Sequence, residues 1–158
     1  QSFLDVFAVY GWLPNNFKWL MKKEIRRVPF VGTACAVAGH IFVDRSNPRA
    51  ALQSMEKVKK ELVDGISTVI FPEGTRTKTG EIGRFKQGAF KIAMDMELPV
   101  VPITLNGFYK AMPSGQPFAN PFSHLSLHIG KPIDISQFTD INDAMLHVRE
   151  KVEHGIVK

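Results

Sequence analysis

Short strand-like runs alternate with helical patterns along most of this chain. Strands are expected at 41–43, 67–71, 99–105 and 125–129, where residues are β-branched or alternate between apolar and polar. Helices are expected at 3–10, 33–38, 87–97 and 141–153, and between Asn47 and Gly65. Strands and helices that alternate in this way predict an α/β fold, with a mixed, largely parallel sheet flanked by helices.

The length and composition are those of a single folded domain covering residues 1–158. A chain of 158 residues, 44% hydrophobic and 22% charged, can bury a sizeable core. Its 20 Lys and Arg residues exceed its 15 Asp and Glu residues, which favours nucleic acid, an anionic membrane surface or a phosphorylated small molecule as partner. No stretch reaches the ~20 apolar residues of a membrane-spanning helix. The single cysteine, Cys35, excludes an intramolecular disulfide and is interpreted as a small packed residue.

The most informative segment for chemistry lies at the end of the strand expected at 67–71. Residues 71–76 read Phe-Pro-Glu-Gly-Thr-Arg. Pro72 ends the strand, and Gly74 allows the backbone to approach a ligand closely. The guanidinium of Arg76 presents a planar set of donors that fits phosphate oxygens. Taken alone, the segment is equally compatible with an ordinary turn that carries a surface arginine.

Four separated segments together resemble one family. Residues 39–45 (Gly-His-Ile-Phe-Val-Asp-Arg), 71–76 and 98–103 (Leu-Pro-Val-Val-Pro-Ile) resemble its second, third and fourth sequence blocks, in the same order and at matching spacing. Residues 1–5 (Gln-Ser-Phe-Leu-Asp) resemble the end of its first block, which normally reads Asn-His, four variable residues and Asp. The family is the glycerolipid acyltransferases, typified by 1-acylglycerol-3-phosphate acyltransferase. The resemblance covers nearly the whole chain.

The resemblance places the family's catalytic histidine immediately before Gln1, so the chain is interpreted as truncated just after that residue and inactive alone. In the family, this histidine takes the proton from the acceptor hydroxyl, which attacks an acyl thioester. Asp5 would orient the imidazole and stabilise its charged form. Around a regular helix the two residues would lie ~140° apart, so they meet only at a bend such as a loop-to-helix junction. Without the other blocks, Asp5 is better explained as a helix N-cap or first-turn acid.

The acceptor's phosphate is expected to bind to cationic side chains. Arg45 and Arg76 are the main candidates, because Arg binds phosphate bidentately and a dianion needs more than one cation. The resemblance adds Lys22 to this cluster, although a solvated basic turn explains Lys22 equally well. Arg84 and Lys86 are better explained as surface charges.

Other residues of the 71–76 segment would contact the acceptor in different ways. Glu73 cannot bind phosphate, and it would accept hydrogen bonds from the acceptor's hydroxyls or hold Arg76 in place. Gly74 and Thr75 offer backbone N–H donors. Residues 101–103 would line the acyl side of the site, although core packing explains them equally well.

An apolar and basic cluster near the N-terminus has two interpretations. It would form an interfacial patch at a membrane, or it would pack against a segment that precedes Gln1. Its basic members are Lys18, Lys22 and Lys23, and its apolar members are Trp12, Leu13, Phe17, Trp19 and Leu20. No metal-ligand spacing is found among His124, His128, His147 and His154. His40, just ahead of a strand, is not expected to be the catalytic base.

Together these features predict an O-acyltransferase. It would move a fatty acyl group from acyl-CoA or acyl-carrier protein to the sn-2 hydroxyl of 1-acylglycerol 3-phosphate, forming phosphatidate in phospholipid synthesis. The transfer would use no cofactor, metal or nucleotide. Expected partners are the lysophospholipid, the acyl donor and a membrane surface on the cytoplasmic side, with no nucleic acid and with any anchor in preceding residues. The alternatives are an acyltransferase for another lysolipid, and a non-catalytic fragment that binds lipid or phosphate.

Overall fold

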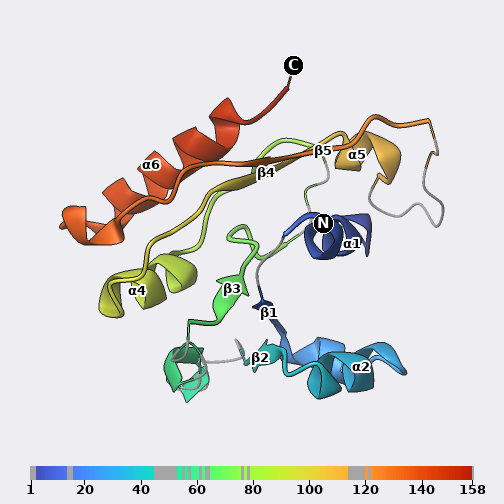
Figure 1. Cartoon of the computed structure of the whole chain (residues 1–158), viewed down its shortest axis with the longest axis horizontal. Helices are drawn as coiled ribbons and strands as arrows, with labels where there is room; N and C mark the ends of the chain where they lie inside the picture. The colour runs from blue at the N-terminus through green and yellow to red at the C-terminus, as the bar shows by residue number, and fades with distance from the viewer. Residues whose placement is uncertain are drawn as a thin grey trace. The chain divides into compact units, whose positions relative to one another are not determined.

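The computed structural model describes residues 3–13, 16–44, 53–54, 56, 58–60, 62, 65–75, 77, 79–113, 120 and 122–157. The chain divides into two compact units, each of which is described by itself (Figure 1). The parallel-sheet unit is Asn15–Phe71, and the two-strand unit is Gln1–Pro14 with Pro72–Lys158. The expectation of a single domain stays a prediction.

The parallel-sheet unit is built on three parallel strands. They are β1 (Phe17–Lys22), β2 (Ile41–Val43) and β3 (Ser67–Val69), in the order β2-β1-β3. Lys22 lies opposite Val43, and Trp19 lies opposite Val69. The strand expected at 41–43 is confirmed, as is the first part of the one expected at 67–71. The central strand, β1, was not expected, because its lysines interrupt the apolar pattern.

Burial of β1 corrects the expectation of an interfacial patch at its apolar residues. Phe17, Trp19 and Leu20 are all buried. The Trp19 ring stacks on Phe71, with centroids 5.4 Å apart, and meets Phe17 edge-on at 5.7 Å. The central strand of a parallel sheet is covered on both faces, so these side chains belong to the core. Trp12, in the other unit, is exposed.

Two short helical segments connect β1 to β2. They are η1 (Lys23–Arg27), a 3₁₀ helix, and α2 (Val31–Val37), which confirms the helix expected at 33–38. Residues 53–54, 56 and 58–60 are helical, in agreement with the helix expected before Gly65. Gly65 has a φ of +70°, which suits the residue after a helix end. The start of that helix lies outside the described residues.

The two-strand unit contains the antiparallel pair β4 (Ile103–Asn106) and β5 (Ser126–Ile129), joined through α5 (Phe108–Ala111). Both strands confirm expected ones, and an isolated bridge between Val100 and Ile133 extends the pairing. Helices α4 (Gln87–Asp95) and α6 (Ile141–His154), with the 3₁₀ turn η2 (Ile135–Gln137), complete the unit, and both helices were expected. The parallel and antiparallel strands with flanking helices confirm the predicted fold class.

Helices α4 and α6 pack over one apolar core. Its buried members are Phe85, Phe90, Ala93, Ile133, Ile135, Ala144 and Val148. Strand β4 also holds the end of α6 through polar contacts. The hydroxyl of Thr104 donates to the carbonyl of Val152 over 2.6 Å, and the Asn106 amide donates to the carbonyl of Gly155 over 2.8 Å. In Figure 1, α6 accordingly runs beside the β4–β5 pair.

The helix expected at 3–10 is α1 (Phe3–Trp12), which contacts β5. It continues through Gly11 to Trp12, two residues beyond the expected end. A glycine inside a helix costs only ~1 kcal/mol, so the surrounding residues keep the helix intact. Among the described residues, no helix has both the length and the apolar character needed to span a membrane.

Candidate functional site

Lys22 lies at the carboxyl edge of the parallel sheet. It is the last residue of β1 and lies opposite Val43, the last residue of β2. Immediately beyond, the ammonium of Lys23 forms a 2.7 Å ion pair with the carboxylate of Asp44. The N–H of Asp44 donates to the hydroxyl of Ser54 over 3.0 Å. Open α/β sheets bind ligands at this edge, so the position of exposed Lys22 fits an anion-binding role.

The two arginines proposed for phosphate binding, Arg45 and Arg76, lie outside the described residues. The described chain reaches the carboxyl edge at Asp44, the residue before Arg45. It also reaches Thr75, the residue before Arg76, in the other unit. Their proposed role stays a prediction.

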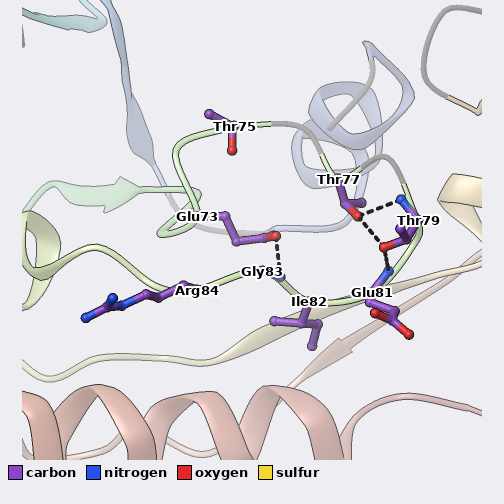
Figure 2. Close-up of a pocket in the computed structure, with 8 residues that line it drawn as sticks. All are labelled: Glu73, Thr75, Thr77, Thr79, Glu81, Ile82, Gly83 and Arg84. Carbon is purple, nitrogen blue, oxygen red and sulfur yellow. Dashed lines mark hydrogen bonds between the residues drawn. The ribbon is translucent and has the colours of Figure 1, made fainter.

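The turn that follows β3 is held by two hydrogen bonds to one downstream segment. The carbonyl of Pro72 accepts from the N–H of Lys86 over 2.9 Å. Oε2 of Glu73 accepts from the N–H of Gly83 over 2.7 Å, as Figure 2 shows. Gly74 has a φ of +70°, a conformation that glycine adopts without strain. The backbone of this turn is therefore held in place by two hydrogen bonds, at Pro72 and at Glu73.

Glu73 thus has a partner that sequence reasoning missed. Its expected roles were to contact the acceptor or to hold Arg76, whereas the structure shows one carboxylate oxygen bound to a backbone N–H. A Cβ atom at Gly83 would lie 2.7 Å from that same oxygen, so only glycine fits there without a shift. A carboxylate that meets a backbone donor ten residues away leaves no pattern in the sequence. The glycine at position 83 was the one sign in the sequence that another group approaches the backbone closely there.

An open pocket of about 180 Å³ lies beside this bond, with a wall of threonine hydroxyls (Figure 2). Its lining residues are Glu73, Thr75, Thr77, Thr79, Glu81, Ile82, Gly83 and Arg84. Oγ1 of Thr77 accepts from the N–H groups of Thr79 and Gly80, at 3.2 and 3.1 Å. The structure thus brings Glu73 and Thr75 together at one pocket. Hydroxyl and carboxylate oxygens suit the recognition of a polyol.

Asp5 lies in the first turn of α1 and is 5% exposed. Carboxylates are rarely buried to this degree unless they have a polar partner, so its burial fits an orienting role for another side chain. The loop-to-helix junction expected just before Asp5 falls outside the described residues and stays a prediction. Asp5 and the 72–75 turn belong to the two-strand unit, whereas Lys22 belongs to the parallel-sheet unit.

His40 and Cys35 have structural environments. Nδ1 of His40 accepts a 3.3 Å hydrogen bond from the N–H of Trp19, on β1. Burial lowers the pKa of His40, and the charge of Lys18 lowers it further, so the neutral imidazole is favoured. Burial raises the pKa of the Cys35 thiol, which makes it a poor nucleophile at neutral pH. Both findings agree with the non-catalytic interpretation of these residues.

Known proteins that are similar to this chain are acyltransferases. Residues 1–106 match the family model described as Acyltransferase. A chloroplastic 1-acyl-sn-glycerol-3-phosphate acyltransferase of Arabidopsis thaliana is 35% identical over 154 residues, covering 97% of this chain and 43% of that protein. A 1-acyl-sn-glycerol-3-phosphate acyltransferase of Cocos nucifera is 40% identical over 111 residues, covering 70% of this chain and 36% of the other.

A solved structure has the same fold. The crystal structure of the 1-acyl-sn-glycerophosphate (LPA) acyltransferase PlsC from Thermotoga maritima superimposes with a TM-score of 0.79 and 25% sequence identity. The match covers 98% of this chain and 61% of the Thermotoga chain. The chain thus spans less than half of the two plant relatives and about three fifths of the bacterial protein.

Proposed function

Since the chain belongs to the acyltransferase family, we propose that the protein acylates the sn-2 hydroxyl of 1-acylglycerol 3-phosphate and so forms phosphatidate. The observation that carries this proposal is the similarity of almost the whole chain to proteins named for that reaction. The carboxyl-edge position of Lys22 and the polar pocket beside Glu73 support it.

The proposed chemistry is direct transfer of the acyl group from the sulfur of a thioester to the hydroxyl oxygen of the acceptor. The acceptor's hydroxyl oxygen attacks the thioester carbon, the new C–O bond forms, and the C–S bond breaks to release a thiol. A general base takes the hydroxyl proton and returns it to the thiolate. The proposal needs that base, a histidine, at the position immediately before Gln1. Asp5, which is buried in the first turn of α1, would hold the imidazole in the productive tautomer.

The proposed phosphate site consists of Lys22, Arg45 and Arg76. A phosphate dianion needs more than one cation, and Lys22 lies at the sheet edge where the chain continues toward Arg45. The backbone of Gly74 and Thr75 would donate to the acceptor. Glu73 would not contact the acceptor, and its hydrogen bond from Gly83 would keep the 72–75 turn in place for these contacts.

The remaining parts of the proposal concern the donor and the cellular setting. Acyl-CoA or acyl-carrier protein would supply the acyl group, with no cofactor or metal. The acceptor is an amphiphile that resides in bilayers, so the protein would work at a membrane surface, on its cytoplasmic face. Net charge of +5 supports an anionic surface as partner.

A panel of acceptors tests the proposal. Acyl transfer by the protein that includes the residues encoded before Gln1 is measured with 1-acylglycerol 3-phosphate, with lysophosphatidylcholine and with a phosphate-free monoacylglycerol. We expect the phosphate monoester to be preferred, and Arg76→Ala to weaken its use by ~2–4 kcal/mol, the range measured when one partner of a charged hydrogen-bonded pair is removed. The control, Lys91→Ala on the exposed face of α4, should leave transfer unchanged. Equal use of all three acceptors, or an Arg76→Ala variant with unchanged kinetics, would contradict this assignment.

A further inference from the structure

Phe30 is presented to solvent in a strained conformation. Its side chain is 91% exposed, with φ of +62° and ψ of −49°. The N–H of Val31 donates to the carbonyl of Pro29 over 2.7 Å, which closes a γ-turn with Phe30 at its centre. The positive-φ form of this turn is rare and strained, and a bulky residue in it is an outlier. Packing of the Phe30 ring within the described chain does not offset this strain, because the ring points into solvent.

The exposed face of α2 continues from Phe30 as an apolar stripe. Phe30, Ala34, Val37 and Ala38 follow one another at helical spacing, and all are exposed, Val37 to 85%. Gly32 is buried on the opposite side. We call Val28, Phe30, Ala34, Val37 and Ala38 the α2 patch. Residues 28–39 contain no charged side chain, which is unusual for a helix that faces water.

The α2 patch is held rigidly. A Cβ atom at Gly32 would collide with the backbone carbonyl of Arg26, so α2 packs closely against η1. The N–H groups of Gly32 and Ala34 donate to the carbonyls of Val28 and Phe30, at 2.8 and 3.0 Å. The exposed apolar side chains are therefore displayed by a fixed backbone, which reduces the entropy lost on binding.

Basic residues flank the α2 patch on the preceding segment. Arg26 and Arg27 are exposed at the end of η1, directly before Val28. The guanidinium carbon of Arg26 lies 5.7 Å from the centroid of the Phe42 ring, so the charged end of this side chain lies next to β2. Glu24 is the one acidic residue between 22 and 39 in the sequence. The surface thus combines apolar anchors with a net positive rim.

We propose that the α2 patch, with Arg26 and Arg27, docks the protein onto a bilayer that contains anionic phospholipids. The apolar side chains enter the boundary between headgroups and acyl chains, and the arginines bind lipid phosphates. Charge complementarity selects this occupant. A stable complex with a protein partner would bury ~800 Å² of complementary surface on each side. A bilayer needs no complementary shape, so a few inserted apolar side chains are enough for binding. The inference rests on the proposed function, because the proposed acceptor resides in such bilayers.

Co-sedimentation of the full chain with vesicles tests the apolar anchor. The vesicles contain equal parts of phosphatidylcholine and phosphatidylglycerol. Phe30→Gly should lower the partition coefficient at least about tenfold, as expected for withdrawing one buried aromatic ring. The same variant should unfold at the same or a higher urea concentration, because glycine adopts positive φ without strain. The control, Leu146→Ala on exposed α6, should bind vesicles like the wild type.

A second variant tests the basic rim. Arg26→Gln combined with Arg27→Gln should weaken binding to the mixed vesicles about 25-fold, since each charge near an anionic surface contributes about fivefold. Binding to pure phosphatidylcholine should not change. Lys91→Gln combined with Lys151→Gln removes the same charge from exposed positions on α4 and α6, and it should have little effect.

Three results would overturn the inference. Phe30→Gly could bind vesicles as tightly as the wild type, or wild-type binding could be indifferent to phosphatidylglycerol. Alternatively, Phe30→Gly could change the sedimentation-equilibrium mass and leave vesicle binding intact, which would assign the α2 patch to a protein partner. Co-sedimentation needs no turnover, so this failure is distinguishable from failure of the proposed acyl transfer.

Discussion

Oε2 of Glu73 accepts a 2.7 Å hydrogen bond from the backbone N–H of Gly83. Together with the bond from the N–H of Lys86 to the carbonyl of Pro72, it ties the turn after β3 to the segment that leads into α4. The residues that the family resemblance assigns to the acceptor are thus fixed by a contact that itself needs no ligand. We infer that Glu73 is a positioning residue.

Replacing the Glu73 side chain should separate its shape from its charge. Glu73→Gln keeps an oxygen that can accept from Gly83, whereas Glu73→Ala removes the acceptor. We expect Glu73→Ala to lower the free energy of unfolding by ~1 kcal/mol and to raise KM for the acceptor, and Glu73→Gln to restore most of both. Urea unfolding and steady-state kinetics measure these effects. A Gln variant as impaired as the Ala variant would show that the negative charge acts on the ligand directly.

Gly83→Ala should damage the same contact from its other side. The added Cβ would lie 2.7 Å from Oε2 of Glu73, so either the carboxylate or the loop must move. We expect a loss of ~1 kcal/mol in the free energy of unfolding, because the flexible end of the Glu73 side chain moves away and its hydrogen bond is lost. Gly11→Ala is the control, because a Cβ there meets nothing within 4 Å and alanine stabilises a helix by ~0.5–1 kcal/mol. Equal stability of the two variants would argue against a tight contact at Gly83.

His40 should make stability depend on pH. The pKa of His40 is lowered in the folded protein, chiefly by burial and also by Lys18, so the unfolded chain binds more protons between the two pKa values. Its contribution is present above the ordinary histidine pKa of about 6.5 and is lost as pH falls through the folded pKa. Urea midpoints measured from neutral pH downward should fall less steeply in His40→Gln than in wild type. His154→Gln, exposed at the end of α6, should retain the wild-type slope, and identical slopes in all three proteins would refute the assignment.

The ion pair between Lys23 and Asp44 should contribute modestly at the carboxyl edge. Its atoms are 2.7 Å apart, but the two side chains remain 42% and 31% exposed. A double-mutant cycle with Lys23→Ala and Asp44→Ala should give a coupling energy of ~0.2–1 kcal/mol that decreases in high salt. The exposed pair Arg149–Glu153, at 2.8 Å on α6, provides a reference cycle. A coupling well above that of the reference would mean that the pair organises the edge.

The fold was predictable where one period dominates a long segment. Helices α4 and α6 follow their apolar stripes to within a few residues of the expected ends. Strand β1 was missed because Lys18 and Lys22 interrupt its apolar run, although its position between two parallel partners buries Trp19 and Leu20. Burial by partners distant in sequence is invisible to a local pattern.

The candidate site was predictable in residue type but not in contacts. The resemblance pointed to Asp5, Glu73 and Lys22, and the structure places them on α1, in a turn and at a strand end. The resemblance could not show that the Glu73 carboxylate accepts from Gly83, since the donor is a backbone N–H whose position depends on the folded loop. Arg45 and Arg76 lie outside the described residues, so their role rests on the resemblance.

Acyl transfer by Asp5→Asn tests the central claim most directly. The protein is prepared with the residues that its gene encodes before Gln1, and release of the thiol from acyl-CoA is followed with 1-acylglycerol 3-phosphate as acceptor. The wild type should turn over, and Asp5→Asn should lose at least about 100-fold in kcat, because an amide orients the imidazole in the wrong tautomer. Equal turnover by the two proteins, or no turnover by the wild type, would contradict the account.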